Sequence, residues 1–346
     1  MIRIKDPARR DGSFLHMRTM TLRHPGGPLR PEVRTDPAPA AGQVRLRVKA
    51  CGVCRTDLHV LDGELPARRP AIVPGHEIVG VVEAIGAGVT DVRVGDRLGA
   101  AWLAWTCGRC RYCREGRENL CDRAEFHGWT RDGGYADKVV VDASYCFPLP
   151  PGLSDAECAP LLCAGLIGFR AWRAACANRE VDALGLYGFG AAAHLLAQLA
   201  IWRGQRVFAF VRRGDEAAAA LARELGCAWA GPSDVPPPEQ LDAAILFAPV
   251  GELVPLALGA VRKGGAVICG GIHMSDIPAM PYARLWGERT LASVANLTRQ
   301  DALDYLPMAL EAGVRPHTAA YPLERANEAL DDLRHGRFAG AAVLVP

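Results

Sequence analysis

Residues 51–77 bring together side chains that bind transition metals. This stretch offers thiols, imidazoles, carboxylates and a hydroxyl within a short span. Cys54 and His76 suit zinc, a borderline-soft ion that takes sulfur and nitrogen ligands. Two ligands do not complete a site, and Cys163, far downstream, offers a third. Three protein ligands leave the fourth position of the metal open, which is typical of a catalytic zinc site.

Four further cysteines indicate a closed metal site. Cys107, Cys110, Cys113 and Cys121 lie in one short segment, and four thiolates suit a tetrahedral structural zinc. An iron–sulfur cluster is the alternative, because bacterial ferredoxins also begin with Cys-x-x-Cys-x-x-Cys. Their fourth cysteine, however, follows after three residues and precedes a proline. Here seven residues separate Cys113 from Cys121 and Asp122 follows, so the spacing favours zinc.

A third pattern is typical of dinucleotide binding. An apolar strand over residues 181–187 is followed by Gly188 and Gly190, an alanine-rich helix and a second strand over residues 206–211. This order predicts the βαβ unit of a dinucleotide-binding domain. Gly188 makes the tight turn, Gly190 lets the backbone approach the pyrophosphate, and Ala193 stands at the third glycine position. The N-terminus of the helix then stabilises the phosphate charge.

The remaining elements predict an α/β chain of two domains. Apolar and polar residues alternate over residues 18–50, and strand-like segments fill residues 78–98, which predicts an antiparallel, barrel-like domain. Later strands extend a doubly wound parallel Rossmann sheet, helices follow residue 300, and a last strand returns to the first domain. We expect a catalytic domain of residues 1–163 and 301–346, with residues 1–16 a loose extension, and a coenzyme domain of residues 164–300.

The composition argues against several classes of protein. The 346 residues include 40 basic and 38 acidic side chains, and a net charge of +2 argues against nucleic acid as a main partner. No apolar run long enough to cross a membrane appears, so we expect no membrane partner. Residues 1–16 lack the apolar core of a signal peptide, so we expect a cytoplasmic location. The twelve cysteines then predict metal ligands or buried thiols, not a disulfide framework.

The segments around the first metal site carry a family resemblance. Residues 52–59 (Gly-Val-Cys-Arg-Thr-Asp-Leu-His), 75–77 (Gly-His-Glu) and 162–165 (Leu-Cys-Ala-Gly) resemble the zinc-containing alcohol dehydrogenases of the medium-chain dehydrogenase/reductase superfamily. The resemblance extends from about Met17 to the C-terminus. It implies a GroES-like first domain, two zinc ions per chain and reversible oxidation of a small alcohol to an aldehyde or ketone with NAD or NADP. It also implies a homo-oligomer, with a tetramer favoured over a dimer.

The resemblance assigns roles to single residues near the metal. Thr56 and His59 match the family's proton relay, in which the threonine hydroxyl takes the alcohol proton and the histidine releases it near solvent. A surface histidine beside a capping threonine is the alternative. Asp57 is expected to orient the ring of His76. Glu77 is expected to lie near the metal and to approach it only transiently.

Three more positions match coenzyme or substrate contacts of the family. Arg55 matches a residue that contacts the coenzyme pyrophosphate, although a solvent-facing arginine is the alternative. Trp102 matches a tryptophan common in the family's substrate pocket. Leu65 stands where some relatives carry a second tryptophan, and the smaller side chain implies more room. Core packing is the alternative for either side chain.

The end of the second dinucleotide-binding strand departs from the NAD pattern. Val211 replaces the acidic residue that usually bonds the ribose 2′-hydroxyl, and Arg212 and Arg213 follow it. Arginine side chains can pair with the 2′-phosphate of NADP. We therefore expect NADP to be used at least as well as NAD. The alternatives are two arginines that point to solvent, or one that stacks on the adenine ring.

Two other functions share parts of the pattern. A zinc-dependent polyol or sugar-alcohol dehydrogenase has similar motifs, but polyol relatives often carry glutamate in place of the third cysteine, so Cys163 argues against it. A non-catalytic, nucleotide-binding zinc protein would need neither the relay nor an open metal position. Turnover of an alcohol with either coenzyme separates the enzyme from this last alternative.

Overall fold

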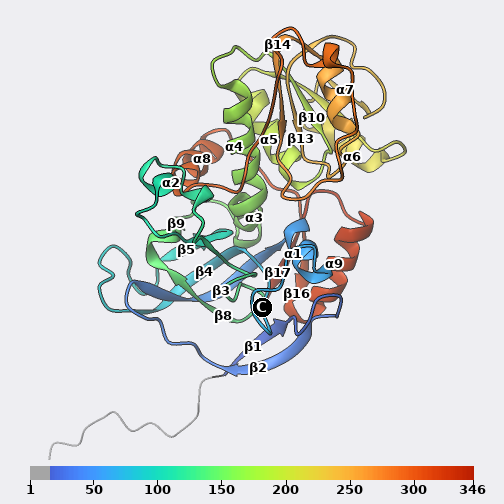
Figure 1. Cartoon of the computed structure of the whole chain (residues 1–346). Coiled ribbons are helices and arrows are strands. Elements are labelled where there is room, and N and C mark those ends of the chain that lie inside the picture. The colour runs from blue at the N-terminus through green and yellow to red at the C-terminus, as the bar shows by residue number, and fades with distance from the viewer. Residues whose placement is uncertain (1–15) are drawn as a thin grey trace, which may run out of the picture.

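The computed structural model describes residues 16–346, which are built around two sheets (Figure 1). One sheet has seven strands and is almost wholly antiparallel, and the other has six parallel strands. This arrangement confirms the predicted α/β fold class, with a barrel-like sheet and a Rossmann sheet. The predicted loose extension lies outside the described residues, apart from His16, which begins β1 (His16–Thr21).

The antiparallel sheet is centred on β3 (Gln43–Val53), which pairs with β4, β8 and β17. Buried and more exposed residues alternate over its first half, whereas its last four residues are all buried. The strand order is β16-β17-β3-β4-β5-β9, with β8 beside β3. The other strands of this sheet are β4 (Glu77–Ile85), β5 (Arg97–Ala100), β8 (Lys138–Asp142), β9 (Cys146–Pro148), β16 (Thr318–Pro322) and β17 (Ala341–Val345). Two small pairs stand apart: β1 with β2 (Arg30–Thr35), and β6 (Leu103–Trp105) with β7 (Glu125–Phe126).

The parallel sheet has the strand order β12-β11-β10-β13-β14-β15, which is that of a dinucleotide-binding fold. The order reverses between β10 (Ala183–Tyr187) and β13 (Leu241–Leu246), so a ligand is expected beyond the carboxyl ends of these strands. Every residue of β10 is buried, as expected for a parallel strand covered on both faces. The other strands are β11 (Arg206–Val211), β12 (Trp229–Pro232), β14 (Val261–Cys269) and β15 (Thr290–Ser293).

Helices cover both faces of the parallel sheet. Side chains of α4, α5 and α6 join one hydrophobic cluster with the sheet, and those of α7 join another on the opposite face. Across residues 16–346 no helix combines the length and hydrophobicity that crossing a membrane requires. The helices are α1 (Arg55–Asp62), α2 (Arg111–Arg114), α3 (Asp155–Pro160), α4 (Leu166–Cys176), α5 (Ala191–Trp202), α6 (Glu216–Glu224), α7 (Leu253–Ala260), α8 (Arg299–Glu311) and α9 (Ala326–His335).

A continuous helical run joins the two sheets. It begins with a capping box, in which the Ser154 hydroxyl accepts the backbone N–H of Glu157 and the Glu157 carboxylate accepts that of Ser154. A single π-helical turn, Leu161–Gly165, separates α3 from α4. Helix α3 packs on β3 and β4, whereas α4 packs on β13 and β14. The π-helical turn, which contains Cys163, therefore lies between the two sheets.

Candidate active site and metal centres

The three residues predicted to bind the catalytic zinc lie together. Cys54, His76 and Cys163, with Glu77, offer ligand atoms that all lie within 4.8 Å of one another. The Sγ atoms of Cys54 and Cys163 are 3.9 Å apart, and Nε2 of His76 is 3.3 Å from Sγ of Cys163. Ligands at ordinary zinc distances in a tetrahedron lie roughly 3.6–3.8 Å apart. The cluster therefore has the atom types and spacing that one tetrahedral zinc requires.

Strand pairing brings two of these ligands together. Cys54 follows the last residue of β3, and His76 precedes the first residue of β4. The two strands pair antiparallel with Gly52 opposite Glu77, so both ligands lie at one end of the sheet. Cys163 arrives from the π-helical turn, and such turns within helices are frequent at functional sites.

Asp57 of α1 holds the ring of the histidine. Its Oδ1 accepts from Nδ1 of His76 at 3.2 Å, and its Oδ2 accepts the backbone N–H of Cys54 at 2.9 Å. The hydroxyl of Tyr135 also donates to Oδ2, at 3.1 Å. These contacts direct Nε2 of His76 toward Cys163, which is the geometry that an orienting carboxylate provides. The sequence motif does not reveal Tyr135, which lies 78 positions from Asp57.

The electrostatics of the cluster fit a bound cation. A hydrogen bond from the Cys163 thiol lowers the pKa of Cys54, and the same contact with Cys54 raises the pKa of Cys163. Burial raises the pKa of Glu77. This carboxylate lies against the backbone of Gly52, where a Cβ would approach Oε2 of Glu77 at 1.7 Å. A second thiolate and an ionised carboxylate can form here when a positive ion compensates their charge, and zinc supplies that charge.

The structure corrects one expectation about the predicted relay. Oγ1 of Thr56 lies 3.8 Å from Sγ of Cys54, and His59 follows one turn later on α1. The sequence places His59 near solvent, but only 7% of this residue is exposed. Its Nδ1–H donates to Oε2 of Glu64, and its ring centroid lies 5.4 Å from that of His273. Neither Glu64 nor His273 belongs to the motif that predicted the relay.

Aromatic side chains border the ligand cluster. The buried ring of Trp102 packs edge-on against His76 with 4.9 Å between centroids. It stacks on Phe126 at 5.2 Å and lies nearly parallel to Trp129 at 6.0 Å. Leu65 is half-buried and packs against the same hydrophobic cluster. Trp102 and Leu65 match positions of the family's substrate pocket, whereas no sequence motif points to Phe126 or Trp129.

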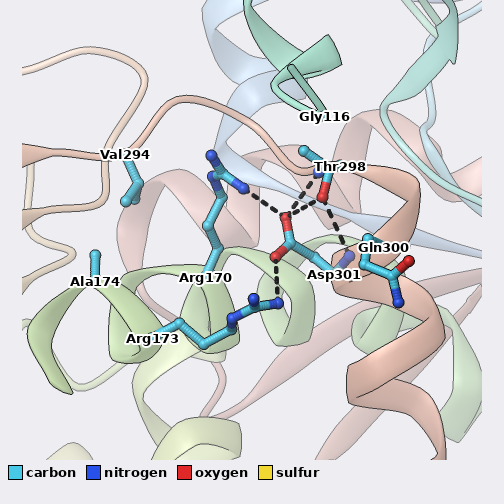
Figure 2. A pocket seen from close by; sticks show the side chains of 8 residues that line it. All are labelled: Gly116, Arg170, Arg173, Ala174, Val294, Thr298, Gln300 and Asp301. Carbon is cyan, nitrogen blue, oxygen red and sulfur yellow. Dashed lines mark hydrogen bonds and ion pairs between the residues drawn. The ribbon is translucent and has the colours of Figure 1, made fainter. Parts of the chain in front are cut away.

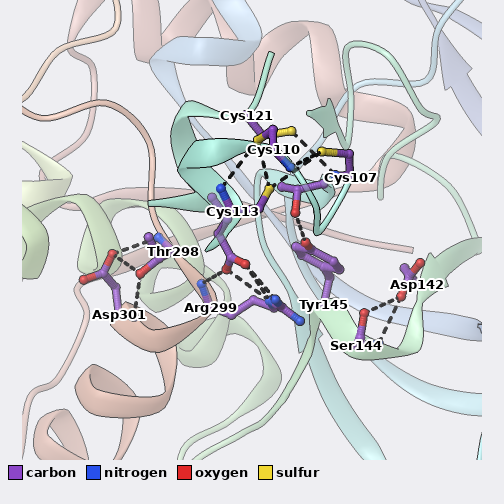
Figure 3. A network of polar contacts seen from close by, with 12 residues as sticks. Cys107, Cys110, Cys113, Cys121, Asp142, Ser144, Tyr145, Thr298, Arg299 and Asp301 are labelled. Carbon is purple, nitrogen blue, oxygen red and sulfur yellow. Dashed lines mark hydrogen bonds and ion pairs between the residues drawn. The ribbon is translucent and has the colours of Figure 1, made fainter. Parts of the chain in front are cut away.

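The four-cysteine segment (residues 107–121) forms a second cluster (Figure 3). Sγ of Cys113 lies 3.5 Å from that of Cys110 and 4.0 Å from that of Cys107, on either side of the roughly 3.8 Å of a tetrahedral zinc–thiolate site. The backbone N–H groups of Arg109 and Cys110 lower the pKa of Cys107 to about 6. Burial raises the pKa of Cys121 to about 11. Four sulfur ligands leave no position for a substrate, as expected for a structural site.

Comparison with known proteins decides the family. Residues 40–151 match the alcohol dehydrogenase GroES-like domain. The chain is 45% identical over 342 residues to the probable alcohol dehydrogenase AdhA of Mycobacterium tuberculosis, and the alignment covers 95% of this chain and 97% of that protein. The chain belongs to the alcohol dehydrogenase family.

Solved structures agree with the fold of this alcohol dehydrogenase. A thermostable alcohol dehydrogenase of Pyrobaculum aerophilum with bound cobalt and zinc superposes with a TM-score of 0.86 at 26% identity, over 96% of this chain and 100% of that chain. Cinnamyl alcohol dehydrogenase of Sorghum bicolor superposes with a TM-score of 0.87 at 26% identity, over 96% and 98% of the two chains. The enzyme is therefore a zinc-dependent, NAD(P)-linked oxidoreductase of the medium-chain superfamily, as the resemblance implies.

The glycine turn of the alcohol dehydrogenase lies at the carboxyl end of β10. Gly188 has a φ of 89°, and a Cβ there would approach the backbone nitrogen of Ala248 at 2.7 Å, so the turn requires glycine. Gly190 precedes α5, and the space that its Cβ would occupy is open. Ala193 is fully buried in the first turn of α5. The turn thus leaves backbone accessible at the N-terminus of this helix.

A buried histidine ties this turn to the antiparallel part of the alcohol dehydrogenase. Nδ1–H of His194 donates to the carbonyl oxygen of Gly190 at 3.3 Å, and its Nε2 accepts the backbone N–H of His317 at 3.2 Å, just ahead of β16. The ring makes both contacts only in its neutral form. Burial accordingly lowers the pKa of His194 to about 4.

The arginines predicted to contact the coenzyme differ in their surroundings. Arg55, Arg212 and Arg213 are all exposed. Arg213 donates to Oδ2 of Asp234 at 2.6 Å. Among residues 16–346, the side chain of Arg212 has no hydrogen-bond or ion-pair partner. Only one of the two guanidinium groups at the end of β11 is thus already paired, and the sequence motif gives no sign of Asp234.

A hollow of about 320 Å³ lies between α4, the start of α8 and the four-cysteine segment (Figure 2). The carboxylate of Asp301 accepts from Arg170 at 2.7 Å, from Arg173 at 3.4 Å and from the hydroxyl of Thr298 at 2.8 Å. Its charge is thus balanced by its neighbours. None of the predicted zinc ligands of the alcohol dehydrogenase lines this hollow, so we assign it no part in the chemistry.

Proposed function

We propose that this alcohol dehydrogenase oxidises aryl-substituted alcohols at a zinc held by Cys54, His76 and Cys163. The observation that supports this substrate class is the aromatic wall beside the ligands, in which Trp102 touches His76 and runs nearly parallel to Trp129. Flat aromatic surfaces favour a flat apolar partner, because offset stacking and edge contacts add to the hydrophobic gain. The similar Sorghum enzyme is named for cinnamyl alcohol, which is of this class.

The side chains around the metal divide the remaining work. Bound zinc supplies a Lewis acid that lowers the pKa of the alcohol hydroxyl, and bound NAD(P) accepts the hydride. Asp57 keeps the ring of His76 oriented, and Glu77 stays within reach of the ion. Thr56 takes the proton of the hydroxyl, and His59 carries it away from the site. Trp102 and Leu65 border the substrate.

Further residues hold the structural zinc and the coenzyme. Cys107, Cys110, Cys113 and Cys121 would hold a second zinc, which would help to keep that part of the chain folded because a structural zinc contributes folding free energy. Arg55 and the N-terminus of α5 face the pyrophosphate of the coenzyme. The residues concerned are Cys107, Cys110, Cys113 and Cys121 for the metal, and Arg55, Gly188, Gly190 and Ala193 for the coenzyme.

The enzyme uses NADP(H) as coenzyme at least as well as NAD(H). Val211 has no carboxylate to bond the ribose 2′-hydroxyl or to repel a 2′-phosphate. The guanidinium of Arg212 is free to bind that phosphate, whereas Arg213 must first leave Asp234. Arg212 is therefore the stronger candidate of the two.

We also propose that the enzyme is a homotetramer and that it is located in the cytoplasm. The tetramer is supported by the absence of a long insertion ahead of the four-cysteine segment. The cytoplasm is supported by the twelve unpaired cysteines, because free thiols suit a reducing compartment. The domains are residues 1–163 with 301–346, and residues 164–300. Analytical ultracentrifugation tests the assembly, and the mass of a dimer would contradict it.

A panel of alcohols tests the substrate class. We expect kcat/KM for benzyl and cinnamyl alcohol to exceed that for ethanol and sorbitol at least about tenfold, which is within the range that apolar pockets achieve. Trp129→Ala should remove most of this preference, whereas Trp286→Ala, at an exposed position, should leave it intact. A wild-type enzyme that prefers ethanol or sorbitol would overturn the proposed class.

A further inference from the structure

We propose that Glu64 is the outer group of the proton relay, which takes the proton from His59 and passes it to solvent. Glu64 acts through His59 and touches no reacting atom, so it is a positioning and proton-transfer residue. The inference rests on the proposed role of His59. It completes that role, because a proton that reaches a buried imidazole still needs a path to water.

The end of α1 places the two side chains together. The helix ends after Asp62, and Gly63 turns the chain back with a φ of 79°. The backbone N–H of Leu65 then donates to the carbonyl oxygen of His59 at 3.1 Å. This closed loop brings the carboxylate of Glu64 against the ring of His59, where Oε2 accepts Nδ1–H. The contact is thus a product of the helix ending and not of a chance side-chain position.

The exposure of the two groups sets the direction of transfer. The side chain of His59 is 9% exposed, whereas that of Glu64 is 41% exposed. Bulk water therefore reaches the carboxylate far more readily than the ring. A carboxylate in contact with both an imidazole and water can accept a proton from the first and release it to the second.

The carboxylate also fixes which nitrogen of the ring is free. An acceptor at Nδ1 holds the proton there and leaves the lone pair of Nε2 for the incoming proton. A proton bound at Nε2 makes the imidazolium, whose Nδ1 proton moves to Oε2 of Glu64 and then to water. This leaves the neutral ring with its proton on Nε2. The Nδ1–H form returns when Nε2 gives its proton to water and Nδ1 takes one proton from water through Glu64, an exchange that moves no net charge. Each cycle therefore moves one proton from the alcohol hydroxyl to solvent, with no net change in the pair.

Other charged groups near this pair define the controls. His273, in the loop after β14, faces the ring of His59 from the coenzyme sheet. Arg334 of α9 binds both oxygens of Asp62, each at 2.7 Å, and also interacts with the charge of Glu64. Asp62 is thus a carboxylate on the same turn that is already paired. It serves as the matched control for Glu64.

Transient proton release tests the inference. Holoenzyme is mixed with coenzyme and benzyl alcohol in a weakly buffered solution, and a pH indicator follows the released proton in a stopped-flow instrument. We expect Glu64→Gln to slow release about tenfold, at the low end of acid–base contributions. Zinc content and the Kd of the coenzyme should stay at wild-type values. Asp62→Asn should release the proton as fast as the wild type, and Glu64→Asp should stay within about threefold of it.

The outcomes separate this inference from the function on which it rests. Slow release by Glu64→Gln but not by Glu64→Asp or Asp62→Asn supports the transfer through the carboxylate. Wild-type release by Glu64→Gln, together with slow release by His59→Gln, overturns the role of Glu64 and leaves that of His59. Wild-type release by His59→Gln overturns the proposed relay itself. Equal slowing by Glu64→Asp and Glu64→Gln also overturns the inference, because any change of shape would then suffice.

Discussion

Arg299, the first residue of α8, binds the carboxylate of Glu118 through three of its nitrogen atoms. The backbone N–H and Nε donate to Oε1 at 2.8 and 3.0 Å, and Nη2 donates to Oε2 at 2.7 Å. The guanidinium also lies over the ring of Tyr145, 4.7 Å from its centroid (Figure 3). Glu118 is nearly buried and lies 181 positions away in sequence. This contact therefore fastens the four-cysteine segment to the C-terminal part of the chain.

Breaking this pair should destabilise the enzyme. Arg299→Ala removes the guanidinium and leaves the buried carboxylate with only the backbone N–H of residue 299, which costs roughly 1–3 kcal/mol. Burial alone would raise the pKa of Glu118, but Arg299 holds it below its usual value of 4.5. The pair therefore stabilises the fold above that pH, and its contribution is lost as the pH falls through the lowered pKa.

Melting temperatures of the wild type and of Arg299→Ala at about pH 7 and about pH 4 check this expectation. The difference between the two proteins should be larger at about pH 7, because Glu118 becomes protonated as the pH falls through its lowered pKa. Arg111→Ala is the control, since Arg111 pairs with Glu115 at the surface and its loss should matter little. Equal melting temperatures for Arg299→Ala and Arg111→Ala would contradict the role of the pair.

Metal analysis should find two zinc ions per chain with separable effects. Cys163→Ser should lose one ion and all turnover but melt near the wild-type temperature. Cys113→Ser should lose the other ion and melt at a clearly lower temperature, because a structural zinc contributes folding free energy. Cys176→Ser, at a half-buried cysteine outside both clusters, should keep two ions. A fully active sample with a single zinc ion would refute the two-site assignment.

Coenzyme preference should depend on Arg212 more than on Arg213. Arg212→Ala should lower kcat/KM for NADP about tenfold or more, the loss of one charge-assisted hydrogen bond, and leave NAD nearly unchanged. Asp234→Asn should improve NADP, because it frees Arg213 and removes a negative charge. Steady-state kinetics with both coenzymes provide the measurement. A tenfold preference of the wild type for NAD, unaltered in these variants, would mean that the arginines do not read the phosphate.

Mild acid should destabilise the fold through His194, whose neutral ring hydrogen-bonds to both Gly190 and His317. Its pKa of about 4 in the folded chain lies below the ordinary 6.5, because burial disfavours the charged ring. The unfolded chain then binds more protons between these two values, so stability falls as the pH drops from about 6.5 to about 4. His194→Gln should melt with a weaker dependence on pH over this interval. His24→Gln, at an exposed histidine, should follow the wild-type curve, and identical curves for all three would exclude the contribution.

Short-range patterns carry most of what the sequence predicts. Cys54 directly follows β3 and His76 directly precedes β4, and these two strands pair, so their motifs imply a common location once the sheet forms. The alternation in β3 and the glycine turn at Gly188 likewise depend on neighbouring residues. These patterns are enough to predict the fold class, the four-cysteine ligand set and the Rossmann unit. The place of Cys163 in the first ligand set, 109 positions from Cys54, depends on the family resemblance instead.

Contacts between distant segments cannot be predicted from short-range sequence patterns, because they depend on the register and packing of whole elements. The hydroxyl of Tyr135 reaches Asp57 of α1 only when the loop ahead of β8 has packed beside Pro74, whose carbonyl oxygen accepts the backbone N–H of Tyr135. The pairing of Arg213 with Asp234 depends on where two parallel strands end. Even the contact of His59 with a nearby carboxylate depends on how the loop after α1 closes.

The position of the π-helical turn determines where the domains of two related alcohol dehydrogenases can be recombined. The GroES-like match ends at residue 151, so it contains Cys54 and His76 but not Cys163. A recombinant chimera joined there would take its third ligand from the other parent, together with that parent's setting of the turn. A junction placed after Gly165 would transfer all three ligands as one inherited unit. The natural seam for swapping coenzyme specificity therefore lies inside a helix and not in the loop where the matched domain ends.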